Sequence, residues 1–305
     1  MSHNKTPFDL NELWVISDND TFLQRCTASG FKTQALLKID YLPTQSLVFS
    51  FSNEAAKRTF DIAKNTPSKK SIFCATHVFY ASVTSALYSL KLIMKSNFYD
   101  ALERQRSVLT LLDTYKQFHL EGDQSQANVV IAEQATPYAM IKEDITPSYI
   151  YSVAEFFEVH YAHIDAQAPC PFTFNGRLKI SGILTVLRKQ PAAPNPKLKR
   201  ALKKLVQHVA CHTAMLTIEN NIITSFVANH IEHKQLLNAA AGPRGLKLTE
   251  FAVGVNGAIS PCIDYRINSQ MNEGISGVHV ALGDGSSGYH IDFLSPDVTF
   301  NPVHL

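Results

Sequence analysis

The chain has 305 residues, of which 45% are hydrophobic and 18% are charged, and its formal net charge is +2. That length accommodates one large domain or two ordinary ones with a substantial hydrophobic core. The near-neutral charge excludes a global basic character, so we expect neither nucleic acid nor a membrane among the partners.

The cysteines and the apolar segments indicate the cellular compartment of the protein. The five cysteines show no CxxC spacing, which argues against a disulfide scaffold and a zinc ribbon and predicts reduced thiols. No apolar core or small-residue cleavage site follows the start of the chain, so a secretory signal is not expected. Polar residues interrupt the most apolar stretch, residues 71–94, and favour a buried helix over a membrane span. We therefore expect a cytoplasmic protein.

Short apolar strands alternate with helical segments in the first half of the chain. Strand patterns lie at residues 45–52, 70–75, 117–120 and 128–132, and helical patterns at 54–63, 78–94 and 101–112. Asn53 is placed to cap the first of these helices. The continuous apolar run at 128–132 is typical of a parallel strand that is buried on both faces. The alternation predicts an α/β layer domain over residues 1–146.

The pattern changes after Thr146-Pro147-Ser148, and the rest of the chain predicts a β-rich domain over residues 147–305. Residues 172–187 predict two strands that turn at Asn175-Gly176, a dipeptide typical of tight hairpins. Residues 214–218 and 222–227 predict a second hairpin, and residues 230–240 a helix. The expected fold class is thus α/β, with an N-terminal α/β layer domain followed by a β-rich C-terminal domain.

A basic segment near residues 188–209 has the pattern of a helical insertion into the β-rich domain. A proline-rich linker at 188–196 leads into it, with Asn195 as the expected N-cap and Pro196 in the first turn. Apolar residues form one stripe at helical spacing, and the basic residues lie largely away from it. The basic face is either a solvated helix surface or a docking surface for an acidic partner or peptide.

Residues that can bind metal gather in three segments near the C-terminal end. Glu250 opens an apolar strand pattern, His279 lies in a second one, and His290 and Asp292 lie in a third. Residues two apart on a strand face the same side, so His290 and Asp292 can converge on one ion. Imidazole beside carboxylate suits zinc, iron, cobalt or manganese. The three segments therefore predict a metal-site scaffold.

The sequences of these segments, Thr-Glu-Phe-Ala-Val-Gly-Val-Asn, Gly-Val-His-Val-Ala-Leu-Gly and His-Ile-Asp-Phe, resemble the ending of a known family. In this order they resemble the thermophilic-type metallo-aminopeptidases, the aminopeptidase T group, and also the related 2,5-dihydroxypyridine dioxygenases. The match is weaker upstream of these segments, and the resemblance as a whole covers about residues 147–295. The resemblance implies a divalent metal cofactor (zinc, cobalt or iron), a peptide or small-molecule substrate, and a homodimer.

The same resemblance implies roles for individual residues. It assigns metal ligation to four side chains: Glu250, His279, His290 and Asp292. A further glutamate of the family corresponds to either Glu155 or Glu158, which would act as a general base. Ser286 stands where the aminopeptidases carry a tyrosine, and Tyr289 is either its replacement or a packing residue.

Two further segments carry residue types suited to chemistry. His160-x-x-His163-x-Asp165 is either a metal site on a loop or a set of polar loop residues. The glycine-rich segment 283–288 is either an anion-binding loop or a turn beside the metal site. The sequence contains no GxSxG elbow, no phosphate-binding glycine motif and no recognisable cysteine nucleophile.

Three functions are compatible with these residues. The main prediction is a divergent metallo-aminopeptidase-like hydrolase, in which a metal ion assists cleavage of a peptide or amide. The second is a non-catalytic homologue, with the metal lost, that binds a peptide in a biosynthetic pathway; the missing tyrosine and the short segment between His279 and His290 favour it. The third is a mononuclear iron ring-cleaving dioxygenase, in which His279, His290 and Asp292 form a two-histidine, one-carboxylate face.

Overall fold

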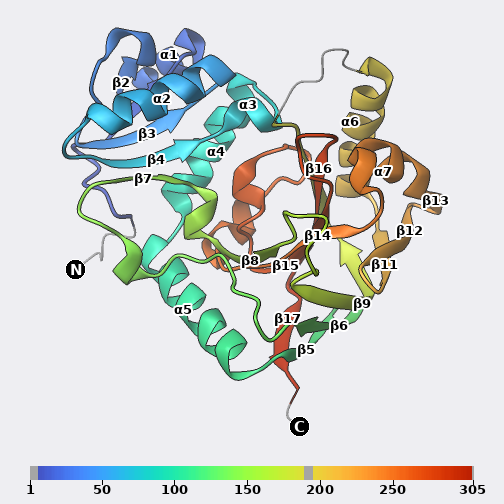
Figure 1. Ribbon diagram of the computed structural model, residues 1–305. Coiled ribbons are helices and arrows are strands. Elements are labelled where there is room, and N and C mark those ends of the chain that lie inside the picture. The colour runs from blue at the N-terminus through green and yellow to red at the C-terminus, as the bar shows by residue number, and fades with distance from the viewer. Residues whose placement is uncertain (1–5, 189–194, 304–305) are drawn as a thin grey trace.

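The computed structural model describes residues 6–188 and 195–303 (Figure 1). Its strands, in chain order, are β1 Trp14–Ser17, β2 Lys32–Ala35, β3 Gln45–Phe49, β4 Lys70–Cys74, β5 Gln117–Gly122, β6 Ser125–Ile131, β7 Tyr149–Ser152, β8 Glu158–Ala162, β9 Phe172–Ile180, β10 Gly182–Val186, β11 Ala214–Glu219, β12 Ile222–Ala228, β13 Ile231–Glu232, β14 Leu248–Gly254, β15 Gly277–Leu282, β16 His290–Pro296 and β17 Thr299–Pro302. Its α-helices are α1 Asp20–Ala28, α2 Asn53–Asn65, α3 Thr76–Phe79, α4 Val83–Lys95, α5 Phe98–Thr114, α6 Pro196–Cys211 and α7 Lys234–Ala241. None of the described helices has both the length and the apolar composition needed to cross a membrane.

A five-stranded parallel sheet, in the order β2-β1-β3-β4-β7, forms the N-terminal layer. Its central strands are apolar on both faces, as is typical of parallel sheets covered by helices. Val15 and Leu47 face a core that includes residues of α1, α4 and α5, whereas Ile16 and Val48 face a core that includes residues of α2. The sheet is therefore sandwiched between helices, as the α/β pattern predicts.

The helix α2 begins one residue earlier than expected. Its N-cap is Ser52 rather than Asn53, and the Ser52 hydroxyl accepts a hydrogen bond from the Ala55 amide at 3.1 Å. Serine and asparagine are about equally favoured at this position, so adjacent Ser and Asn leave the boundary ambiguous by one residue. The prediction that Asn53 caps the helix is wrong by that one position.

Two antiparallel sheets pack face to face in the rest of the molecule (Figure 1). One is seven-stranded, in the order β13-β12-β11-β9-β6-β5-β17, and the other is five-stranded, in the order β10-β16-β15-β14-β8. Their inner faces share one hydrophobic core, to which Phe174 and Phe251 both belong. The expected fold class, an α/β N-terminal part followed by a β-rich part, is confirmed.

The strand over residues 128–132 is not the parallel strand that was expected. It belongs to β6, which pairs antiparallel with β5 and β9. Its residues alternate between buried and exposed, and Val130 is 42% exposed. An apolar run alone does not distinguish a strand with two buried faces from one whose outer face carries a valine.

The expected hairpin at Asn175-Gly176 is also wrong. The strand β9 continues through this dipeptide to Ile180, and β10 then joins the other antiparallel sheet by pairing with β16. Gly176 has φ +136°, and a Cβ atom there would lie 2.4 Å from the Cα of Ala127. The glycine therefore permits a close approach between strands instead of a turn.

The sheets are shared across the boundary expected near residue 146. The strands β5 and β6 precede that boundary but join the seven-stranded sheet, whereas β7 follows it and completes the parallel sheet. A division at residue 146 therefore does not coincide with a division between sheets.

The predicted hairpin β11–β12 is confirmed, and so are the N-cap Asn195 and the first-turn proline Pro196 of α6. The linker before them, at 189–194, lies outside the described residues.

Candidate metal centre

The five-stranded antiparallel sheet has one apolar face and one polar face. Residues such as Phe251 and Phe293 point into the core that it shares with the seven-stranded sheet. Because strand side chains alternate between faces, the neighbouring positions point the other way. The polar face carries Glu158 and His160 on β8, Glu250 on β14, His279 on β15, and His290 and Asp292 on β16.

These side chains form a cluster, called here the carboxylate–histidine cluster. Nε2 of His290 lies 2.9 Å from Oδ1 of Asp292 and 3.6 Å from Oε2 of Glu250. Nε2 of His279 lies 3.5 Å from Oε1 of Glu250 and 3.5 Å from Oε2 of Glu158. The residues expected to act as metal ligands thus lie together, with Glu250 between the two histidines. That they bind a metal stays a prediction.

Alanine residues at the centre of the polar face make room for the cluster. Ala281 lies between Glu250 and Asp292 in one cross-strand row, and Ala252 occupies the next row beside His279. Side chains that face each other on antiparallel strands are only about 4.5–5.5 Å apart at Cβ. A methyl group at these places therefore allows the longer carboxylates and imidazoles to lean toward one another.

Four buried polar atoms of the cluster have no hydrogen-bond partner within the described residues: Oε2 of Glu158, Nδ1 of His160, Nε2 of His279 and Oδ2 of Asp292. Leaving such an atom unpaired costs about 1–3 kcal/mol. Glu250, His279 and Asp292 each offer one atom within 4.8 Å of the others, and so do Glu158, His160 and Glu250. The donor set therefore fits a cation held by carboxylate oxygens and imidazole nitrogens.

The loop between β15 and β16 orients His290. The Nδ1 of His290 donates a hydrogen bond to the Gly283 carbonyl at 3.1 Å, because a carbonyl can only accept, and this leaves Nε2 as the atom that faces the cluster. Metal-binding histidines are commonly held by such a bond from the other ring nitrogen. Gly283 has φ +75°, and a Cβ atom there would lie 1.9 Å from the Tyr289 carbonyl oxygen, so only glycine fits.

The close packing of acids and histidines shifts their pKa values. Burial alone would raise the pKa of Glu250, but the imidazole of His279, 3.5 Å away, and the charges of His160 and His290 outweigh it and lower that pKa far below its usual range. Burial likewise opposes the charged form of His290, yet Asp292 and Glu250 raise its pKa to about 10. Without a cation, the cluster therefore carries protonated histidine beside ionised carboxylate.

The alternatives Glu155 and Glu158 lie in different surroundings. Glu158 begins β8 and contributes its buried carboxylate to the cluster. Glu155 is exposed in the 3₁₀ turn before that strand, and its Oε1 accepts a hydrogen bond from the Ser152 amide at 2.7 Å. Glu155 lines the cleft but forms no ion pair with the cluster among the described residues. Of the two, Glu158 is the one placed to act there, and its role as a base stays a prediction.

His160 is the cluster residue that sequence analysis treated only as part of a loop. It lies on β8 instead, with Nδ1 3.3 Å from Oε1 of Glu158. Burial opposes its charged form, but the adjacent carboxylate of Glu158 and the charge of Glu250 raise its pKa to about 9. The signal that identifies His160 is its spacing of two from Glu158, which places both on one face of a strand.

Glu273 was missed entirely by sequence analysis. It follows the 3₁₀ turn Gln270–Asn272 and lines the same cleft as the cluster. Burial raises its pKa well above the usual range, and the negative charges of Asp292, Glu158 and Glu250 raise it further. Both causes favour the protonated form of the carboxyl group. No periodic pattern surrounds it in the sequence, so no local signal points to it.

The rest of the His160 segment is structural. The Nε2 of His163 hydrogen-bonds to the Ala168 carbonyl at 2.9 Å, and the His163 carbonyl accepts a hydrogen bond from Arg244 at 2.6 Å. Asp165 accepts a hydrogen bond from the Gln167 amide at 2.9 Å, as in a turn. These two residues are thus polar loop residues, one of the two readings left open.

The glycine-rich segment is a turn in which the amides of both serines already have acceptors. Asp284 accepts hydrogen bonds from the Ser286 and Ser287 amides at 2.7 and 2.8 Å, so these donors are not available to an anion. Tyr289, considered as a replacement for the family's tyrosine, does not line the cleft of the cluster. It lines neighbouring cavities beside α6 instead.

The cluster forms one wall of a cleft with a volume of about 460 Å³. The apolar part of its lining comes from the N-terminal layer, chiefly from Phe60 on α2, Phe73 on β4 and Val78 on α3. The ring centroids of Phe60 and Phe73 are 5.0 Å apart. A polar wall that can hold a cation and an apolar wall that can hold a side chain are together suited to binding a small substrate.

The chain is similar to two solved structures and matches one protein-family model. Wild-type AmpT from Thermus thermophilus has a TM-score of 0.48 and 13% sequence identity, and the match covers 97% of this chain and 94% of that one. The 2,5-dihydroxypyridine dioxygenase from Pseudomonas putida KT2440 has a TM-score of 0.48 and 10% sequence identity, and the match covers 96% of this chain and 89% of that one. No curated protein sequence matches the chain. The family model described as crocagin biosynthetic protein CgnE/B matches residues 10–303. The chain therefore belongs to the family of crocagin biosynthetic proteins CgnE/B.

Proposed function

We propose that this protein is a metal-dependent hydrolase that acts on a peptide or amide within a biosynthetic pathway. The observation that carries the proposal is the set of buried, unpaired donor atoms that converge from Glu158, His160, His279 and Asp292. Buried polar atoms are almost always paired in folded proteins. A divalent cation bound to the cluster would pair them and would take the place of the protons that the histidines carry without it.

The arrangement of ligands is consistent with one or two ions. Two groups of three residues could each hold an ion, and both include the carboxylate of Glu250. The first group is Glu250, His279 and Asp292, and the second is Glu158, His160 and Glu250. A shared carboxylate is the usual bridge when two ions lie side by side. The mixture of imidazole and carboxylate favours zinc, cobalt, manganese or iron over magnesium or calcium.

The cleft provides groups that can handle substrate and protons. A bound cation supplies Lewis acidity toward an amide carbonyl and an attacking water. At the edge of the cluster, Oε1 of Glu158 lies 3.3 Å from Nδ1 of His160, and the Glu158 carboxylate is suited to accept a proton from that water. The carboxyl group of Glu273 lines the same cleft, where burial and the neighbouring acids favour its protonated form, and this form can give a proton to a departing amine. The apolar wall that includes Phe60 and Phe73 excludes water and holds the substrate side chain.

Metal analysis of the purified protein tests this proposal. We expect one or two equivalents of zinc, cobalt or manganese after purification without chelator, and a melting temperature that falls when chelator removes them. One equivalent of oxygen-sensitive iron would instead support the ring-cleaving dioxygenase. No bound metal, together with a melting temperature that responds to no added metal or chelator, would contradict the proposal and support a non-catalytic peptide-binding protein.

A further inference from the structure

A groove continues from the metal cleft along α6. Two cavities of about 370 and 470 Å³ lie between α6, α3 and β10, and they share the lining residues Phe79, Thr185, Lys199 and Tyr289. The second cavity shares Val78 and Phe79 with the metal cleft. The two cavities, called here the α6 groove, therefore open into the cleft at α3.

The α6 groove differs from the cleft in its charged residues, because the cleft combines acids with histidines and the groove carries basic side chains. Among the described residues, the groove is lined by Lys199, Lys203 and Arg266 and by no carboxylate. Arg266 is already paired with Asp264 at 2.9 Å. Lys199 and Lys203 are exposed and have no ion pair within the described parts of the chain. These two ammonium groups are therefore available to a negatively charged ligand.

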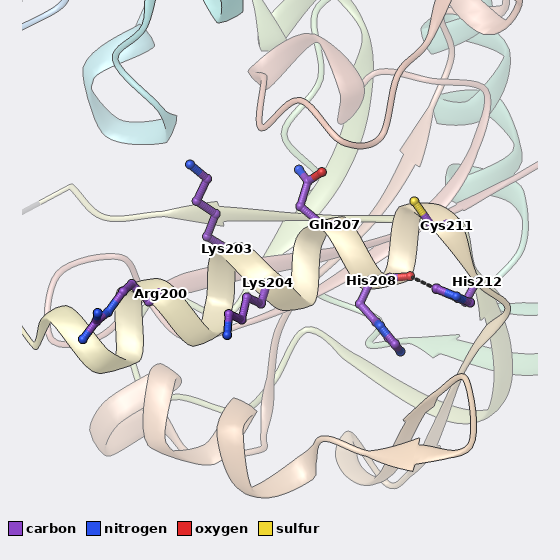
Figure 2. A pocket seen from close by; sticks show the side chains of 7 residues that line it. All are labelled: Arg200, Lys203, Lys204, Gln207, His208, Cys211 and His212. Atoms are coloured by element: carbon purple, nitrogen blue, oxygen red, sulfur yellow. Dashed lines mark hydrogen bonds between the residues drawn. The ribbon is translucent and has the colours of Figure 1, made fainter.

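Only one side of α6 faces the groove. Figure 2 shows Lys203 and Gln207 on one side of the helix, and Lys204 and His208 on the other. The Nζ of Lys203 lies 3.4 Å from the Tyr80 hydroxyl and 5.1 Å from the centre of its ring. This contact holds one positive charge at the mouth of the groove. Lys204 has the same charge on the same helix but lies outside the groove.

The floor of the groove is apolar, and its backbone is not free for pairing. Leu202 and Val206 on α6 line it together with Phe79. The side chain of Asn268 covers the unpaired edge of β10. It accepts a hydrogen bond from the Thr185 amide at 2.9 Å and donates one to the Thr185 carbonyl at 2.8 Å. A peptide therefore cannot add to β10 as a strand at this point. Recognition has to use side chains, which means charge and apolar contact.

We propose that the α6 groove binds an acidic segment of the peptide substrate, with apolar side chains facing its floor and carboxylates facing Lys199 and Lys203. The rest of the peptide then passes α3 into the cleft. This proposal rests on the proposed function, because it assumes a peptide substrate for the same site. In this proposal, the lysines of α6 that line the groove select the substrate.

The test measures binding of a fluorescein-labelled peptide of alternating glutamate and leucine by fluorescence anisotropy. Its partner probe carries glutamine in place of glutamate. We expect the wild-type protein to bind the acidic peptide and not the glutamine peptide. The double variant Lys199→Glu/Lys203→Glu should bind it at least about tenfold more weakly, because two attractive surface contacts become repulsive.

The matched control is Lys197→Glu/Lys204→Glu, which changes the net charge of the same helix equally but leaves the groove unchanged. Its affinity should fall by less than about threefold at 0.15 M salt, where exposed charges are screened over ~8 Å. Equal losses in the two variants, or equally tight binding of a labelled single-stranded DNA, would mean a general polyanion surface and overturn the proposal. So would the absence of binding to wild-type protein.

The result can be separated from that of the metal experiment. Peptide binding in the α6 groove is measured with and without chelator, since the lysines do not depend on a cation. Acidic peptide bound without metal would support the groove and leave only the proposed chemistry in question. Metal bound without any affinity for the acidic peptide would overturn the groove and leave the proposed hydrolase intact. Melting curves of both variants confirm that they are folded.

Discussion

The cleft beside the carboxylate–histidine cluster and the exposed face of α6 both concentrate charge, but in opposite ways. In the cleft, Asp292 is 1% exposed and His279 is 2% exposed, and acids and histidines contact one another directly. On α6, basic side chains such as Lys199 and Lys204 are exposed and have no ion pair within the described residues. In the cleft, each charged side chain of the cluster is stabilised by an oppositely charged neighbour. On α6, these lysines face solvent without such a neighbour among the described residues.

The two regions therefore differ in how they can contribute free energy to binding. Buried charges are costly unless they are paired, and removing one partner of a buried pair costs about 3–5 kcal/mol. Exposed charges cost little, and a surface ion pair contributes only about 0–1 kcal/mol. The cleft should therefore respond strongly to a cation, to pH and to single substitutions. The α6 face should change ligand binding with almost no change in stability.

The largest expected effect is that of His290→Ala. The substitution removes a ligand and leaves Asp292 without the imidazole 2.9 Å away. At a metal concentration about a thousand times the dissociation constant, binding contributes about 4 kcal/mol of stability, and we expect most of it to be lost. Urea unfolding with zinc and with chelator measures this. His119→Ala, on β5 outside the cleft, is the control and should keep the zinc effect. A zinc effect that survives in His290→Ala would contradict the assignment.

Glu158→Gln should have the next largest effect, on metal affinity. The amide keeps the shape of the side chain but removes the charge that lies 3.5 Å from Nε2 of His279. We expect affinity for zinc to fall by about 10–100-fold. Glu155→Gln, three residues earlier, should leave affinity within about twofold, because that residue is exposed in the turn. Competition with a coloured chelator measures both, and equal losses would mean that the cluster does not include Glu158.

The pH dependence should have opposite signs for folding and for metal binding. In metal-free protein the pKa of His290 is raised from 6.5 to about 10, so its stabilisation is complete below pH 6.5 and is lost as the pH rises through about 10. The loss amounts to at most ~1.4 kcal/mol per pH unit for one group. Metal binding needs neutral imidazole, so zinc affinity should rise over the same range.

Unfolding of chelator-treated protein and zinc titration, both between about pH 7 and 10, measure these two trends. The variant His290→Ala separates this residue from the others, because its metal-free stability should change less steeply with pH. Stability that rises with pH in metal-free wild-type protein would contradict the ionisation described for the cluster.

The smallest expected effect is that of neutralising the outer face of α6. Lys197→Gln and Lys204→Gln should each change the free energy of unfolding by less than about 0.5 kcal/mol, since the side chains are exposed and unpaired. Urea unfolding measures the change. Leu202→Ala, on the buried face of the same helix, should cost about 2–5 kcal/mol by comparison. A large effect of the lysines would show that they hold the helix in place and are not free for a ligand.

The sequence alone determines the local features of the site. The spacing of two between His290 and Asp292 places both on one face of a strand, because strand geometry has a period of two. The N-cap Asn195 and the proline after it define the start of α6, because capping involves only neighbouring residues. The order of three motifs near the end of the chain indicates which side chains are brought together. Each of these signals depends on short stretches of chain.

Only the tertiary structure decides which strands become neighbours. Phe251 pairs with Val280 and Tyr161 across β14, and Ala127 with Gly176 across β6 and β9. Sequence patterns give the faces of a strand but not its partners, because pairing depends on the packing of segments far apart in the chain. For this reason the strand at 128–132 and the Asn-Gly dipeptide were misassigned, Glu273 was missed, and the groove along α6 could not be foreseen.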